Sequence, residues 1–179
     1  MLNATWAVKR FLVLVMAIST LLLSVSVQAQ QDQSSATFTS KEGAFSVILP
    51  GTPKEKSEDI SSTNGPTTLH TFMVERNEGQ NFFVVGYSDY QTKLDAAGSL
   101  AGVINGQVES LKGKITSDKT VTLNGHPGRS VTIEAEGILF FSTVYVAGNR
   151  LYQIMYGMPK SDVTPPDAKE FFDSFRILI

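Results

Sequence analysis

The chain has 179 residues, with 15 Lys and Arg against 17 Asp and Glu, 42% apolar residues and no Cys. This composition is typical of a globular protein, and it disfavours collagen, disulfide-stapled miniproteins and Cys-ligated metal sites. A net charge of −2 also disfavours nucleic acid as a partner, because a DNA-binding surface needs an excess of Lys and Arg.

Residues 1–29 have the order of a secretory signal peptide. Lys9 and Arg10 precede an apolar run over residues 11–27, and Ala29 supplies a small residue for cleavage. We therefore predict export to the periplasm or the extracellular space. The alternative is an uncleaved N-terminal anchor, since the run lies at the lower edge of the roughly 17–25 residues that span a membrane. That anchor would then be the expected contact with a membrane.

Cleavage after Ala29 would leave 150 residues, with 13 Lys and Arg against 17 Asp and Glu and a net charge of −4. Trp6, the single tryptophan, would leave with the signal. The polar residues 30–37 predict a short disordered lead. Residues 38–179 predict one domain, large enough to fold on a core without disulfides.

The first half of this domain has the pattern of strands separated by turns. Pro50-Gly51 ends the first apolar strand, Asn64-Gly65 reverses the chain, and so does Asn77-Glu78-Gly79. Strands are expected at residues 45–49, 67–76 and 81–90, and the charged residues 54–60 predict an edge strand or a loop.

A helix is predicted over residues 95–112, because the apolar side chains there are three and four positions apart. Asp95 is the expected N-cap and Gly113 the expected C-terminal stop. The apolar face is formed by Ala97, Leu100, Ala101, Ile104, Val108 and Leu111.

The second half adds strands, a short helix and a terminal strand. Strands are expected at residues 114–123, 128–136, 138–147 and 150–157, the helix at 167–175 and the last strand at 176–179. The prediction is an α+β fold, an antiparallel β-sheet with two helices packed on one of its faces.

The familiar catalytic and cofactor motifs are missing from the sequence. It has no G-x-S-x-G, no H-E-x-x-H and no G-x-G-x-x-G. His70 and His126 lie on separate segments, so a metal site would need the fold to bring them together. We predict no enzyme activity, no cofactor and no metal.

Five tyrosines occur on the predicted strands or at their ends, namely Tyr87, Tyr90, Tyr145, Tyr152 and Tyr156. They are expected to pack against one another across the sheet. The alternative is that they line a pocket for an apolar ligand.

The first helix carries Gly98, Gly102 and Gly106, which form a bare groove at four-residue spacing. Each glycine costs roughly 1 kcal/mol of helix propensity relative to Ala. Close approach of this helix to the sheet would account for the glycines, and a docking groove for a partner helix is the functional alternative.

The segment 124–129, Asn-Gly-His-Pro-Gly-Arg, combines turn residues with two side chains that a turn does not require. These are His126 and Arg129. Arg129 has the geometry for a two-pronged contact with a carboxylate or phosphate. The pair are candidate binding residues, and solvated loop residues are the alternative.

Several stretches together resemble the PsbP-like superfamily, which includes the Ran-binding Mog proteins and the periplasmic DcrB type. The similar stretches are residues 43–53, 123–129, 149–154 and 171–176. The resemblance covers about residues 38–179 and implies an αβα-like sandwich whose members are accessory or interaction proteins.

The leading functional hypothesis is therefore an exported, non-enzymatic domain that binds a protein or another component of the bacterial cell envelope. The first alternative is a carrier of a small apolar ligand, with a cavity beside Tyr87, Tyr152 or Tyr156. The second is a hydrolase in which His70 or His126 meets a carboxylate or hydroxyl.

Overall fold

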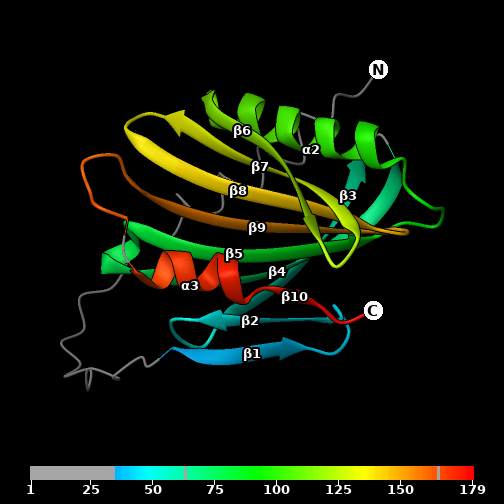
Figure 1. Cartoon of the computed structure of the whole chain (residues 1–179), viewed down its shortest axis with the longest axis horizontal. Helices are drawn as coiled ribbons and strands as arrows, with labels where there is room; N and C mark the ends of the chain where they lie inside the picture. The colour runs from blue at the N-terminus through cyan, green and yellow to red at the C-terminus, as the bar shows by residue number, and fades with distance from the viewer. Residues whose placement is uncertain (1–34, 63, 165) are drawn as a thin grey trace.

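The computed structural model describes residues 35–62, 64–164 and 166–179 (Figure 1). The predicted signal peptide lies outside these residues. The elements, in chain order, are β1 (Ala36–Ser40), β2 (Phe45–Leu49), β3 (Lys54–Ser62), β4 (Gly65–Arg76), the 3₁₀ turn η1 (Asn77–Gly79), β5 (Asn81–Asp89), α2 (Ala96–Leu111), β6 (Lys114–Leu123), β7 (His126–Ala135), β8 (Ile138–Ala147), β9 (Arg150–Pro159), α3 (Pro166–Ser174) and β10 (Arg176–Ile177).

A seven-stranded antiparallel sheet dominates the fold, in the order β3-β4-β5-β9-β8-β7-β6. The predicted turns close its hairpins. At Asn124 and Gly125, for example, φ is 50° and 83°, as a two-residue turn between twisted strands requires. The charged strand β3 lies at one edge, as predicted, and the exposed strand β6 lies at the other.

Helix α2 begins as predicted, but its C-terminus differs in detail. The Asp95 carboxylate accepts a hydrogen bond of 2.8 Å from the Gly98 backbone N–H. At the other end Lys112, rather than Gly113, takes the left-handed conformation, with φ 50°. Gly113 is needed for close packing instead, because a Cβ there would lie 2.5 Å from Ile133 Cγ2.

A second, three-stranded sheet has the order β1-β2-β10. Strand β1 was not predicted, and it corrects the expectation of disorder at Ala36 and Thr37, the last two residues of the predicted lead over residues 30–37. Ala36 and Thr37 pair with Leu49 and Ile48 of β2, so the ordered domain begins before residue 38.

The two helices lie on opposite faces of the large sheet, which corrects the prediction of a single helical face (Figure 1). Strand β5 shows this most simply. Its residues Phe83, Val85 and Tyr87 belong to a core with α3 and β2, whereas Phe82 and Val84 belong to a core with α2. The sheet is therefore the middle layer of an α+β sandwich.

The glycines of α2 do not share one environment. Gly98 and Gly102 are exposed and Gly106 is buried. Close packing against the sheet therefore cannot account for the whole series, and a partner at this groove stays a prediction. Within the ranges described here, no helix has the length and apolar character needed to cross a membrane.

Candidate functional site

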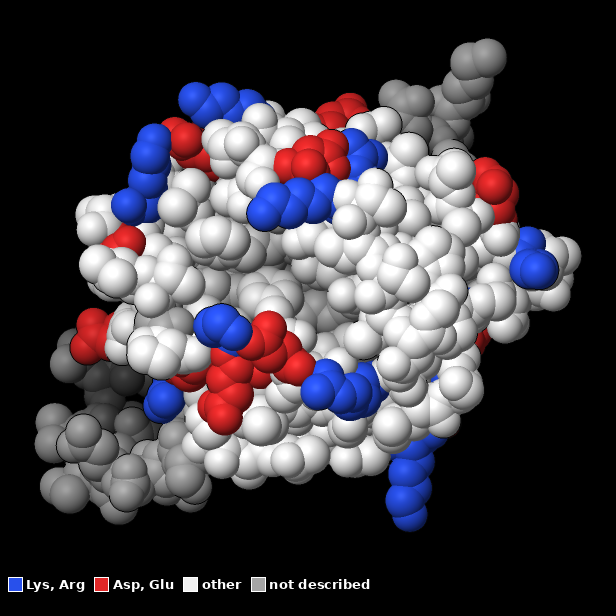
Figure 2. Space-filling model, in the orientation of Figure 1, with Lys and Arg blue, Asp and Glu red and all other residues white. Residues whose placement is uncertain are grey.

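A cleft opens on the large sheet, on the face opposite α2. Its volume is about 290 Å³. It is lined by Val121, Ser130, Val131, Thr132, Phe141, Thr143, Tyr145, Ile154, Phe172 and Asp173. We call this site the sheet cleft. Figure 2 shows a hollow in this face with uncharged walls and with acidic side chains gathered over α3 along one side.

The cleft exists because the second layer is narrower than the sheet. Strand β2 and helix α3 pack over β4, β5 and β9, where the core side chains are buried. Strands β6, β7 and β8 extend beyond that cover, so Phe141 and Tyr145 stay only partly buried. The sequence places such side chains on this face because strand residues alternate between faces.

The lining combines an apolar floor with hydroxyl groups. Ile154 is 1% exposed and forms part of the floor. The Thr143 hydroxyl donates to Ser130 Oγ at 3.0 Å. The Tyr145 ring stacks on Phe175, with centroids 6.2 Å apart and an interplanar angle of 4°. Burial raises the pKa of Tyr145, which keeps its hydroxyl neutral and able to donate.

Charged groups lie at the rim on α3. Asp173 borders the cleft and pairs with Lys169 one helical turn away. Both side chains are well exposed, at 61% and 81%, so this pair contributes little to stability. Asp173 and Glu170 also line a shallow depression on the outer side of α3.

Neither of the two predicted binding residues lines this cleft. Arg129 donates to Asp118 through Nε at 2.9 Å and Nη2 at 2.5 Å. This hydrogen bonding lowers the pKa of Asp118. The register pairs Arg129 with Val144, which packs toward α2, so the guanidinium lies on the opposite face. His126 begins β7 and is partly exposed. The binding role of both residues stays a prediction.

The histidines are also far apart. Strands β5, β9 and β8 separate their strands, which corresponds to about 19 Å across a sheet. Among the residues described, no group of three His, Asp or Glu side chains could hold a metal ion.

His70 does meet a hydroxyl, as the hydrolase alternative requires. Its Nδ1 lies 2.8 Å from Ser57 Oγ, across the β3–β4 pair. The imidazole also stacks on Tyr87, with centroids 4.6 Å apart. An activated nucleophile needs a third group that orients the base. Within the described ranges, no carboxylate is hydrogen bonded to this ring.

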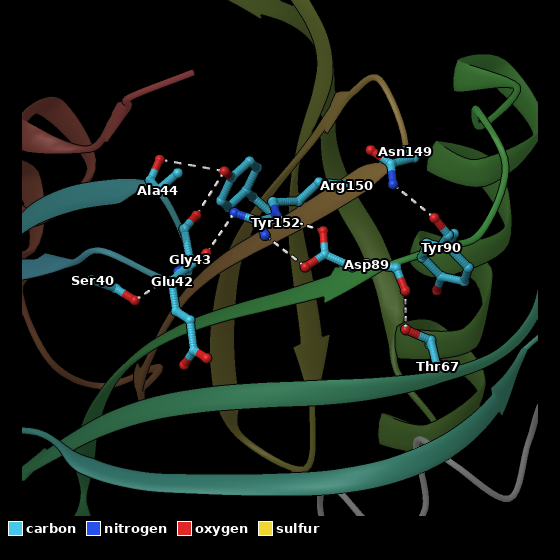
Figure 3. Close-up of polar contacts among 10 residues, drawn as sticks. All are labelled: Ser40, Glu42, Gly43, Ala44, Thr67, Asp89, Tyr90, Asn149, Arg150 and Tyr152. Carbon is cyan, nitrogen blue, oxygen red and sulfur yellow. Dashed lines mark hydrogen bonds and ion pairs between the residues drawn. The ribbon is translucent and has the colours of Figure 1, made fainter.

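A second polar cluster lies at the start of β9 and joins the two sheets (Figure 3). Arg150 donates to both carboxylate oxygens of Asp89 at 2.6 Å and to the Glu42 carbonyl at 2.9 Å. The Tyr152 hydroxyl donates to the Gly43 carbonyl at 2.8 Å. These contacts fix the β1–β2 turn against the large sheet. These contacts have a structural role, and no motif in the sequence indicates them.

The tyrosines confirm the packing interpretation. Tyr87, Tyr152 and Tyr156 are 2%, 0% and 0% exposed in the core with α3, and Tyr90 is buried on the α2 side. The sheet cleft lies next to two of the three tyrosines proposed for a carrier, because its lining residues Tyr145 and Phe141 pair with Tyr152 and Tyr156, but none of the three lines it. Of the five, Tyr145 alone borders it.

We expect these tyrosines to make the protein unstable at alkaline pH. Burial raises the pKa of Tyr152, Tyr156 and Tyr145 above the value of 10.0 that an unfolded tyrosine has, and Tyr87 is shifted the same way. The neutral form is thus favoured in the folded state. Its stabilising contribution is complete below pH 10 and is lost as pH rises through the higher folded-state pKa values.

A titration followed by tyrosinate absorbance and by near-ultraviolet circular dichroism tests this expectation. The ionisation of these tyrosines should coincide with loss of the tertiary signal, and a chain denatured in guanidinium should titrate near pH 10. Full ionisation of the folded chain before any loss of tertiary signal would contradict it.

Sequence reasoning offered Tyr145 as a pocket residue and missed the other residues of the sheet cleft. The available signal was the alternation on β7 and β8, where Ser130, Thr132, Thr143 and Tyr145 occupy every second position. That alternation predicts a face that is not fully apolar. It does not predict which part of the face the second layer leaves uncovered.

Comparisons with known proteins establish the fold. No protein-family model matches the sequence, and no curated protein matches it. The solution structure of cyanobacterial PsbP (CyanoP) from Synechocystis sp. PCC 6803 is similar, with a TM-score of 0.56 and 7% identity over 86% of this chain and 98% of that chain. A crystal structure from Bacteroides thetaiotaomicron gives a TM-score of 0.43 and 14% identity, over 81% of this chain and 48% of that one. The likeness to CyanoP confirms the predicted PsbP-like α+β fold.

Proposed function

We propose that this protein is an exported, non-enzymatic accessory domain of the bacterial cell envelope, and that it binds a protein partner through the sheet cleft. The cleft itself is the observation that carries this proposal. It combines apolar contact area, hydroxyl groups and a charged rim, which are the features of a protein–protein contact with a central anchor.

The open form of the cleft, rather than its volume, favours a protein partner over a carried ligand. Sites for small ligands usually enclose about 300–1,000 Å³ and bury most of the ligand. The sheet cleft has about 290 Å³ and is open to solvent (Figure 2). That space suits one large side chain of a partner, which is how interface anchors bind.

The contacts of His70 favour a structural role over hydrolysis. The ring is stacked on Tyr87 and bonded to Ser57 at the outer hairpin of the sheet. The sheet cleft lies on strands β6–β9, at the other side of the sheet. A nucleophile at Ser57 would therefore lie outside the sheet cleft, the site that we assign to a partner.

Export rests on the N-terminal sequence and is tested by mass. The secreted protein should begin at Gln30 and show no tryptophan emission, because Trp6 is removed with the signal. Intact-mass measurement of the protein from the envelope fraction checks this. Recovery of the full 179-residue chain with the membrane would establish the uncleaved anchor instead.

Filling the sheet cleft should abolish partner capture. Thr132 lines the cleft on β7 and is partly buried, so Thr132→Tyr places a ring in the space while keeping a residue suited to a strand. Thr120→Tyr is the matched control, because Thr120 pairs with Arg129 on the other face of the sheet.

The measurement is cross-linking of the tagged protein in its native envelope, followed by mass spectrometry. Proteins captured by the parent and by Thr120→Tyr should be lost with Thr132→Tyr. An identical set of proteins from all three chains, with unchanged melting temperatures, would show that the cleft is not the binding site.

A further inference from the structure

We propose that the partner inserts an aromatic side chain into the sheet cleft and places a neighbouring Lys or Arg against the carboxylates of α3. This inference rests on the proposed function and specifies the chemistry of the partner segment. The apolar floor at Ile154 and the ring of Phe172 supply the contact for the aromatic group.

The charges around α3 favour a cationic neighbour. Asp167, Glu170 and Asp173 lie on the helix, and Asp162 lies on the loop before it. Figure 2 shows acidic side chains gathered over α3 beside the hollow. The cations of this region all have partners. Lys169 pairs with Asp173, Lys160 on the loop pairs with Glu134 at 2.7 Å, and Arg176 Nη1 donates to the Asp173 and Phe175 carbonyls at 2.7 and 2.8 Å.

Asp173 connects the cleft with the outer surface of the helix. It borders both the sheet cleft and the shallow depression that Glu170, Lys169 and Ser174 also line. A segment that leaves the cleft across α3 therefore passes Asp173 first and Glu170 next. A positive side chain beside the aromatic anchor would reach these two carboxylates.

The Lys169–Asp173 pair shows that an ammonium group is accommodated at this position. Both groups are mostly exposed, so a partner's cation could displace Lys169 at little cost. Lys169 is thus an internal competitor of the partner. Removal of the Lys169 charge from the binding surface is therefore expected to strengthen binding.

A cation also lies on β6, outside the lining of the cleft. Lys119 of β6 pairs with Ser130 and so lies on the cleft face of the sheet. It faces the side away from α3. Lys119→Gln is therefore the control variant. It should weaken the binding of an acidic partner and leave the binding of a basic partner unchanged.

The test uses the full chain and a fluorescein-labelled peptide, Gly-Ser-Gly-Phe-Arg-Gly-Ser-Gly, with fluorescence anisotropy as the readout. Matched peptides carry Ala in place of Phe, or Glu in place of Arg. The Phe-Arg peptide should bind most tightly, and added salt should weaken it. Thr132→Tyr should abolish its binding.

The charge variants should act in opposite directions. Asp173→Asn should weaken the Phe-Arg peptide about two- to fivefold, and Lys169→Gln should tighten it about twofold. Lys119→Gln should leave it unchanged. Asp173→Asn should not damage the fold, because a carboxylate in the last turn of a helix opposes the helix dipole.

Three results would overturn the inference. They are no binding of the Phe-Arg peptide to the parent, equal binding of the Phe-Glu peptide, and an unaltered affinity in Asp173→Asn. The proposed function is tested separately, by the loss of envelope partners in Thr132→Tyr. Failure of the peptide experiment would therefore contradict the inferred chemistry of the partner and not the proposed function.

Discussion

Replacing Phe45 with Ala is expected to lower the free energy of unfolding by about 3–5 kcal/mol, the usual cost of removing a buried aromatic ring. Phe45 is 0% exposed and contacts aromatic rings of β1, of the large sheet and of the segment after α3. Its ring centroid lies 5.5 Å from that of Phe72 on the large sheet and 5.7 Å from that of Phe175 after α3. The substitution would leave a cavity where the two sheets and the helix meet.

Phe38→Ala is the matched control for this effect. Phe38 belongs to the same aromatic cluster, with its centroid 6.0 Å from that of Phe45, but it is only partly buried on β1. Its loss should therefore cost clearly less, about 1–2 kcal/mol for the smaller area removed from the core. Urea unfolding of both variants provides the comparison. Equal losses would mean that Phe45 does not hold the layers together.

Replacing Arg150 with Lys should lower the free energy of unfolding by about 1–3 kcal/mol, the range for hydrogen bonds to charged groups. The side chain is 15% exposed and donates in two directions, to Asp89 and to the Glu42 carbonyl (Figure 3). Its guanidinium carbon also lies 4.9 Å from the centroid of Tyr87. An ammonium group reproduces neither the two-pronged contact nor the planar stacking.

Arg129→Lys offers a control with the same chemistry in a more exposed place. Arg129 also makes a two-pronged contact, but its side chain is 27% exposed, and it spans only the adjacent strands β6 and β7. Its loss should cost less than about 1 kcal/mol. Arg150→Lys should also increase amide exchange in β1 and β2, whereas Arg129→Lys should not. Equal effects on stability would show that Arg150 does not bind the two sheets together.

The local elements of the fold were largely predictable from the sequence. Asn124-Gly125, Asp95 and the apolar spacing of α2 act through residues a few positions away, so a short window contains the information. Strand β1 was missed for the same reason. Its exposed residues show no pattern of their own, and pairing with β2 defines it.

The sequence by itself determined the hairpins, the two helices and the α+β class, because turn residues and periodicity express local conformational preferences. Only the tertiary structure decided which helix covers which face, which carboxylate Arg129 binds, and where the sheet stays uncovered. Arg129 meets Asp118 through the β6–β7 register, which a bulge between Ile115 and Ser117 shifts. The sheet cleft likewise depends on a second layer narrower than the first, a property of packed elements that no single segment contains.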